Sequence, residues 1–121
     1  MRKRAKREVA AILAELKRAF QAIYGDRLVK MVLFGSHARG DAEPGSDIDV
    51  LVVLRGNVDA GEEIARTSEV LADLCLAHNE VVSCVFIGEA RFTTRQGPLP
   101  RNVRREGLFA FERDQHLRNR R

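Results

Sequence analysis

The chain has only two cysteines, three prolines and no long apolar run. Cys75 and Cys84 are separated by eight residues and form no CxxC pattern, so we expect two buried free thiols. The longest uninterrupted apolar runs are five or six residues, far short of a membrane span. The basic start leads into a charged amphipathic segment, which differs from the apolar core of a signal peptide. These absences argue against a disulfide-rich or membrane protein and favour a cytoplasmic location.

Charge of one sign dominates only the two ends of the chain. The net charge is +4, but residues 1–7 carry +5 and residues 115–121 carry +3. Residues 8–114 hold 13 basic and 17 acidic residues, so the body carries −4. A surface built mainly for nucleic acid is therefore weakly supported, and we expect the basic ends to be solvated and flexible. Contact of these ends with RNA or an acidic partner stays open.

Apolar periodicity divides the chain into alternating helices and strands. The 121 residues suffice for one core, so we expect a single domain over 1–121. The expected elements, in chain order, are a helix over about 4–24, a strand over 27–34, a short helix opening at Ser36, a strand over 48–54, a helix over 61–77 and a strand over 81–87. This order predicts an α/β fold.

Two segments near the C-terminus carry weaker patterns. Residues 88–100 are polar and broken by glycine and proline, so no element is predicted there. Residues 101–111 predict a helical turn that ends near Gly107, followed by a short apolar piece. This apolar piece could complete the core or serve as an interface.

Strand alternation predicts which residues share a face. In the first strand, Val29, Met31 and Leu33 are expected on one face, with Val32 and Phe34 on the other. The strand over 48–54 is apolar almost throughout, which is typical of a strand covered on both faces.

Two short motifs at the ends of the first two strands indicate a chemistry. Gly35-Ser36 stands where a strand turns into a helix, a place where backbone can approach a phosphate closely. Asp47 and Asp49 flank Ile48 at the start of the next strand, so both carboxylates point to one face and suit a divalent cation. Turn and capping roles are the alternative for both motifs. The two motifs together favour a nucleotide and metal site.

The string Gly35-Ser36, a ten-residue gap and Asp47-Ile48-Asp49 resembles the nucleotidyltransferase superfamily that includes DNA polymerase beta. Residues 33–53 are most similar to the minimal nucleotidyltransferases, antitoxin partners of HEPN-domain toxins. The resemblance implies a small mixed β-sheet with helices packed on one side. It also implies ATP as substrate and two Mg²⁺ ions, which Asp47 and Asp49 would bind while Gly35 and Ser36 hold the triphosphate.

Two further residues of the motif are candidates for supporting roles. Arg39 follows Ser36 by one helical turn and could neutralise triphosphate charge, with surface solvation as the equal alternative. Ser46 resembles the serine that precedes the family's first aspartate and is expected to orient Asp47. His37 lies within the motif, and a plain exposed position is expected for it.

The third strand departs from the family pattern. Active members carry a third carboxylate there, and the corresponding position holds Ser83, which cannot act as a base. Glu80 lies three residues earlier, with opposite strand parity, so it reaches the site only if the strand begins late or bulges. Without a third carboxylate, nucleotide binding should survive better than turnover.

Two hypotheses follow for the function. The first is adenylyl transfer from ATP to a hydroxyl of a partner protein, with a HEPN-domain toxin as the partner and a tyrosine as the acceptor that the resemblance suggests. The second is a catalytically degenerate module that neutralises its partner by stoichiometric contact. Transfer to an antibiotic or an RNA end would need an acceptor domain or a nucleic-acid track, for which little of the chain remains. A homo-oligomer stays open.

Overall fold

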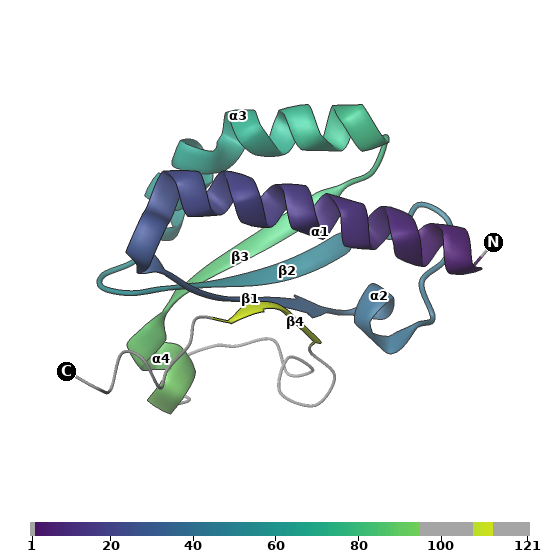
Figure 1. The fold of residues 1–121 in the computed structure, drawn as a ribbon. Helices are drawn as coiled ribbons and strands as arrows, with labels where there is room; N and C mark the ends of the chain where they lie inside the picture. Colours follow the sequence, from purple (N-terminus) through teal and green to yellow (C-terminus); the bar gives the residue numbers. More distant parts are fainter. Residues whose placement is uncertain (1, 95–107, 113–121) are drawn as a thin grey trace.

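The computed structural model describes residues 2–94 and 108–112, with side chains over 7–94 and at Phe111 (Figure 1). Its helices and strands, in chain order, are α1 (Arg2–Tyr24), the 3-10 turn η1 (Gly25–Arg27), β1 (Leu28–Phe34), α2 (Ser36–Arg39), β2 (Ile48–Leu54), α3 (Ala60–His78), β3 (Val82–Gly88), α4 (Glu89–Thr94) and β4 (Leu108–Glu112). Five predicted elements agree with α1, β1, β2, α3 and β3 to within about two residues. The short helix opens at Ser36 as predicted.

The strands form one mixed sheet in the order β3-β2-β1-β4. Strand β1 runs antiparallel to both β2 and β4, whereas β2 and β3 are parallel. Helix α3 makes the crossover between β2 and β3, because two parallel strands cannot be joined by a tight turn. Helices α1 and α3 lie side by side over one face of the sheet (Figure 1). The predicted small mixed sheet is confirmed, and its two long helices pack on one side.

Two apolar layers hold the sheet. Under α1 and α3, the side chains of Ile12, Leu16 and Phe20 are fully buried against the first face of the sheet. The second face carries its own buried cluster, which receives Phe92 of α4: Val29, Val32, Phe34, Leu51, Val53 and Ile87. Burial on both sides explains why β2 is apolar almost throughout.

The predicted faces of β1 are correct except at Val29. The register with β2 shifts between Leu28 and Lys30, which is the signature of a β-bulge. Because a bulge adds one residue to one strand, the alternation of side chains changes there. Val29 therefore joins the second-face cluster, while Met31 belongs to the core under the helices.

The C-terminal part differs most from the expectations. Residues 89–94 form helix α4, although no element was predicted over 88–100. The predicted helical turn ending near Gly107 lies outside the described residues. The short apolar piece is strand β4, and it pairs with β1, with Phe111 opposite Met31. None of the helices over the described ranges is long and apolar enough to cross a membrane.

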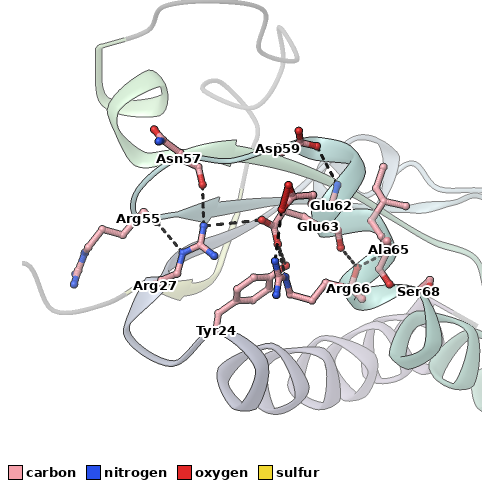
Figure 2. Close-up of polar contacts among 12 residues, drawn as sticks. Tyr24, Arg27, Arg55, Asn57, Asp59, Glu62, Glu63, Ala65, Arg66 and Ser68 are labelled. Atoms are coloured by element: carbon pink, nitrogen blue, oxygen red, sulfur yellow. Dashed lines mark hydrogen bonds and ion pairs between the residues drawn. The ribbon is translucent and has the colours of Figure 1, made fainter.

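A buried carboxylate fastens α3 to the end of α1. Figure 2 shows Glu63, whose Oε1 accepts hydrogen bonds from Tyr24 Oη at 2.7 Å and Arg66 Nε at 3.1 Å. Arg27 Nη2 lies 4.0 Å from the other oxygen, Oε2. Burial, and then the hydrogen bond to the Glu63 carboxylate, raises the pKa of Tyr24. Glu63 is only 2% exposed, so these partners must offset the cost of burying its charge.

Glu63→Gln should lower the free energy of unfolding by about 2 kcal/mol, because the buried network loses its negative charge and one of its two acceptor oxygens. Chemical denaturation monitored by circular dichroism measures this loss. The matched control is Glu62→Gln, since Glu62 is exposed and makes only a 3.9 Å ion pair with Arg66. Equal, small effects in both variants would show that the network adds nothing to stability.

Candidate active site

The site lies where β1 ends and β2 begins. Asp47 directly precedes β2, and Asp49 is its second residue, paired with Phe34 at the end of β1. Ile48 is fully buried and belongs to the core under the helices. Because successive strand residues point to opposite faces, Asp49 lies on the second face, and Asp47, two residues earlier, follows the same alternation. Asp47 is exposed and Asp49 half-buried.

Gly35 forms the back of the site. It caps α2 with φ 79° and ψ −157°, a conformation that favours glycine. A Cβ at this position would lie 2.5 Å from Asp49 Oδ2. We predicted that glycine permits the close approach of a phosphate. The Asp49 carboxylate occupies the space that a side chain at residue 35 would fill, so the glycine leaves room for the aspartate. The approach of a phosphate stays a prediction.

Gly35→Ala should destabilise the fold by about 2 kcal/mol and displace Asp49, because φ is positive and the methyl group meets the carboxylate. Gly56→Ala is the matched control, since Gly56 also has a positive φ of 86° but open space at its Cβ. Thermal melts should show a larger loss for Gly35→Ala than for Gly56→Ala. Equal losses would mean that the contact with Asp49 is not constraining.

The two carboxylates disfavour each other's charge. Burial raises the pKa of Asp49, the neighbouring Asp47 carboxylate raises it further, and His37 lowers it. A divalent cation would relieve both unfavourable effects, and carboxylate oxygens are the ligands that Mg²⁺ prefers. The aspartate pair therefore fits such an ion. The described part of the chain has no group of three or more His, Cys, Asp and Glu side chains that could hold a metal.

The raised pKa of Asp49 predicts a stability cost in the absence of metal. Between the ordinary Asp pKa of 3.8 and the raised value, the native state binds more protons than the unfolded state. The free energy of unfolding must therefore fall as the pH rises through this window. With EDTA present, Asp49→Asn should have a higher Tm than the wild type above the window, by a few degrees. Thermal melts across the pH range test this expectation. A higher Tm for the wild type than for Asp49→Asn at pH 7 would contradict it.

Ser36 and Arg39 lie at opposite ends of α2. Ser36 opens the helix directly after Gly35 and is half-buried. Arg39 Nε donates to Asp41 Oδ2 at 3.2 Å, and both side chains are substantially exposed. Ser36 thus directly follows the glycine beside Asp49, and Arg39 is directed toward Asp41 in the following loop.

Ser46 and His37 hold the loop that leads into β2. Ser46 Oγ accepts a hydrogen bond from the Glu43 amide at 2.9 Å, so the hydroxyl closes the turn before Asp47. His37 Nε2 lies 3.2 Å from the Ser46 carbonyl oxygen and is half-buried. His37 is also close enough to Asp49 to lower the pKa of that carboxyl group. The plain exposed position expected for His37 is wrong, because its ring bridges α2 and the loop.

Ser83 occupies the position beside Asp49 on β3. The parallel register pairs Asp49 with Ser83, so both side chains lie on the second face. Glu80 precedes β3, and its amide donates to the Cys75 carbonyl at 3.1 Å. Val81 continues the ladder by accepting from the Ile48 amide, so Glu80 has the parity of the helix-covered face. The register therefore brings Ser83 to the aspartate pair, and it does not bring Glu80 there.

Comparison with known proteins identifies the family. Residues 13–105 match the family model described as nucleotidyltransferase domain. This match spans more than half of the chain and includes the aspartate pair. The chain therefore belongs to the nucleotidyltransferase domain family, and its fold is that of this family.

Two proteins of Methanocaldococcus jannaschii that bear the name "Putative protein adenylyltransferase" are similar in sequence. MJ0604 is 34% identical over 100 residues, which cover 82% of this chain and 94% of that protein. MJ0141 is 42% identical over 48 residues, which cover 40% of this chain and 48% of that protein.

Solved structures share the fold at lower sequence identity. A toxin–antitoxin crystallised with AMP-PNP has a TM-score of 0.62 at 21% identity, over 86% of this chain and 76% of that chain. A "putative nucleotidyltransferase" from Sulfolobus solfataricus has a TM-score of 0.59 at 21% identity, over 94% of this chain and 86% of that chain. The toxin–antitoxin MntA-HpeT, in a mutant form, has a TM-score of 0.59 at 18% identity, over 86% of this chain and 75% of that chain.

Proposed function

We propose that this chain transfers an adenylyl group from Mg²⁺-bound ATP to a hydroxyl of a partner protein. The observation that carries the proposal is the aspartate pair, held on the second face of the sheet with Asp49 against Gly35 at the start of α2. The name of the relative MJ0604 supports protein adenylylation as the reaction.

Each residue has a definite task in this reaction. Asp47 and Asp49 hold the metal, which supplies positive charge to the triphosphate when bound. Gly35 and Ser36 present backbone amides to the phosphates at the start of α2. Arg39 would contact the phosphates only if its hydrogen bond to Asp41 were replaced by one to a phosphate oxygen. His37 keeps the loop before Asp47 closed.

The transfer itself is a substitution at the α-phosphorus of ATP. The acceptor oxygen forms a bond to this phosphorus, and the bond from it to the bridging oxygen toward the β-phosphorus breaks. Pyrophosphate leaves with the electron pair of the broken bond, and the proton of the acceptor hydroxyl passes to solvent. The protein contributes by placing the two oxygens in line.

We propose a HEPN-domain toxin as the partner, acting in the cytoplasm, with a tyrosine as the acceptor. The two toxin–antitoxin structures of similar fold support a toxin partner, and the motif over 33–53 suggests its HEPN class. We propose that this partner completes the site.

Labelled ATP tests the reaction with a co-expressed HEPN-domain partner. Label in the α-phosphate should appear on the partner, whereas label in the γ-phosphate should not. Transfer of the γ-label would indicate a kinase, and no transfer of either label would refute adenylylation.

A second function is favoured by Ser83, which stands beside Asp49 without a carboxylate. In this alternative, the chain neutralises its toxin by stoichiometric contact alone. The double variant Asp47→Asn/Asp49→Asn separates the two functions in cells. Loss of protection supports transfer, and full protection supports the contact alone.

A further inference from the structure

Strand β3 is an edge of the sheet. In the order β3-β2-β1-β4, the described strands place β2 on one side of β3 and no strand on the other. Proteins usually protect such an edge with charged side chains, proline or a bulge, because it can pair with another chain. The sequence of β3, VSCVFIG, contains no charge and no proline, and its register with β2 is regular. As far as residues 2–94 and 108–112 show, the edge is therefore open to pairing.

The backbone groups on this edge can be assigned. The Ile48 amide donates to the Val81 carbonyl at 2.8 Å, so the main chain of residue 81 faces β2. Because the direction alternates along a strand, residues 83 and 85 also face β2, and residues 82, 84 and 86 face the free edge. The Val82 amide points outward and is 3.4 Å from Cys75 Sγ. The outward groups for pairing then begin at the Val82 carbonyl and the Cys84 amide.

Two exposed apolar side chains and one small polar side chain lie next to this edge. Val81 is 55% exposed and Val85 is 40% exposed, and Ser83 lies between them, also exposed. All three share the second face with the aspartate pair, because Ser83 is paired with Asp49. The edge strand thus carries two exposed valines on either side of a small residue that adjoins the site.

We propose that the free edge of β3 binds an extended segment of the acceptor protein as an added strand. Such pairing takes affinity from main-chain hydrogen bonds and specificity from alternate side chains. The acceptor residue would lie opposite Ser83, and apolar residues two positions away on either side would lie beside Val81 and Val85. This inference rests on the proposed adenylyl transfer.

The geometry of added strands restricts the acceptor. Neighbouring strands are about 4.8 Å apart, so the new strand runs roughly 10 Å from β2 and its aspartates. A serine or threonine hydroxyl lies one bond beyond Cβ and stays over its own strand. A tyrosine hydroxyl lies at the far end of its ring and reaches across Ser83, whose small side chain leaves the way to Asp49 open. Its phenolic oxygen can then attack the α-phosphorus with the bond changes given above.

A synthetic peptide tests the docking directly. The probe is a short strand of alternating valine and threonine with one central tyrosine and lysines at both ends. Binding is followed by fluorescence anisotropy, which requires no transfer, and labelling by [α-³²P]ATP with Mg²⁺ is followed separately. We expect the tyrosine to be labelled, and we expect the serine version and a version N-methylated along one edge to remain unlabelled.

Variants of the full chain locate the binding. Val81→Lys and Val85→Lys should weaken peptide binding and lower kcat/KM for the peptide at least about tenfold, with ATP affinity unchanged. Leu76→Lys is the matched control, because Leu76 is 81% exposed but lies on α3. Equal weakening by all three substitutions, or none by any, would overturn the docking proposal.

The remaining outcomes separate the two proposals. Peptide binding that depends on Val81 and Val85 without any ATP binding would refute the transfer and keep the docking edge. ATP binding with a peptide that neither binds nor is labelled would refute the docking edge alone. A homodimer that Val85→Lys disrupts, with no effect on the peptide, would assign the edge to a second copy of this chain and overturn the proposal.

Discussion

Asp47→Asn and Asp49→Asn are each expected to lower the transfer rate by at least about a thousandfold, which corresponds to about 4 kcal/mol of transition-state stabilisation. The physical reason is that an amide cannot supply the negative charge that holds a divalent cation at this position. The fold should survive both changes. Asp47 is exposed, and the protein should be more stable once the unfavourable charge on Asp49 is removed.

The matched control for these two substitutions is Asp73→Asn. Asp73 lies exposed on α3, so this variant removes the same charge from the chain without touching the site. Transfer by Asp73→Asn should equal that of the wild type, and circular dichroism should show all three variants folded. Full transfer by folded Asp47→Asn and Asp49→Asn would contradict the assignment of the metal site.

Ser83→Asp is expected to increase the transfer rate by about tenfold to a hundredfold. The register places residue 83 beside Asp49 on the same face, so the new carboxylate would add a third oxygen ligand or a base. Mg²⁺ affinity should rise with it, because three carboxylates repel one another more strongly without a cation.

Ser83→Asn is the control, because asparagine has the size of aspartate but carries no charge. Single-turnover labelling and Mg²⁺ titration should separate the two variants, with only Ser83→Asp gaining affinity and rate. If both variants are as slow as the wild type, the partner supplies the missing group or none is needed. A Ser83→Asp variant that is slower than the wild type would contradict the expected gain.

The sequence predicts the elements that carry a clear apolar pattern. Strand β2 is predicted residue for residue, because its apolar run is bounded by an aspartate and by Arg55-Gly56. Helix α4 was not predicted, since six residues are too few for a helical period to stand out. Strand β4 is shorter still, with five residues, and its pairing with β1 is a contact between distant parts of the chain. The bulge after Leu28 is likewise a property of the pairing and leaves no local signal.

The candidate site was also predicted only in part. Alternation along β2 predicts that Asp47 and Asp49 share a face, and parity along β3 predicts that Ser83 adjoins them. The contact of Gly35 with Asp49, and the bridge from His37 to the Ser46 carbonyl, depend on how the loop over residues 40–47 folds. A two-residue motif contains no information on such contacts, because they form only once β1 and β2 have paired.

The most direct test of the account is calorimetric titration of ATP into the purified chain with Mg²⁺. We predict binding that requires Mg²⁺ and that the Asp47→Asn/Asp49→Asn variant loses, while Asp73→Asn retains it. Binding of ATP with equal affinity by the double variant, or without Mg²⁺, would contradict the claim that the aspartate pair forms the metal and nucleotide site.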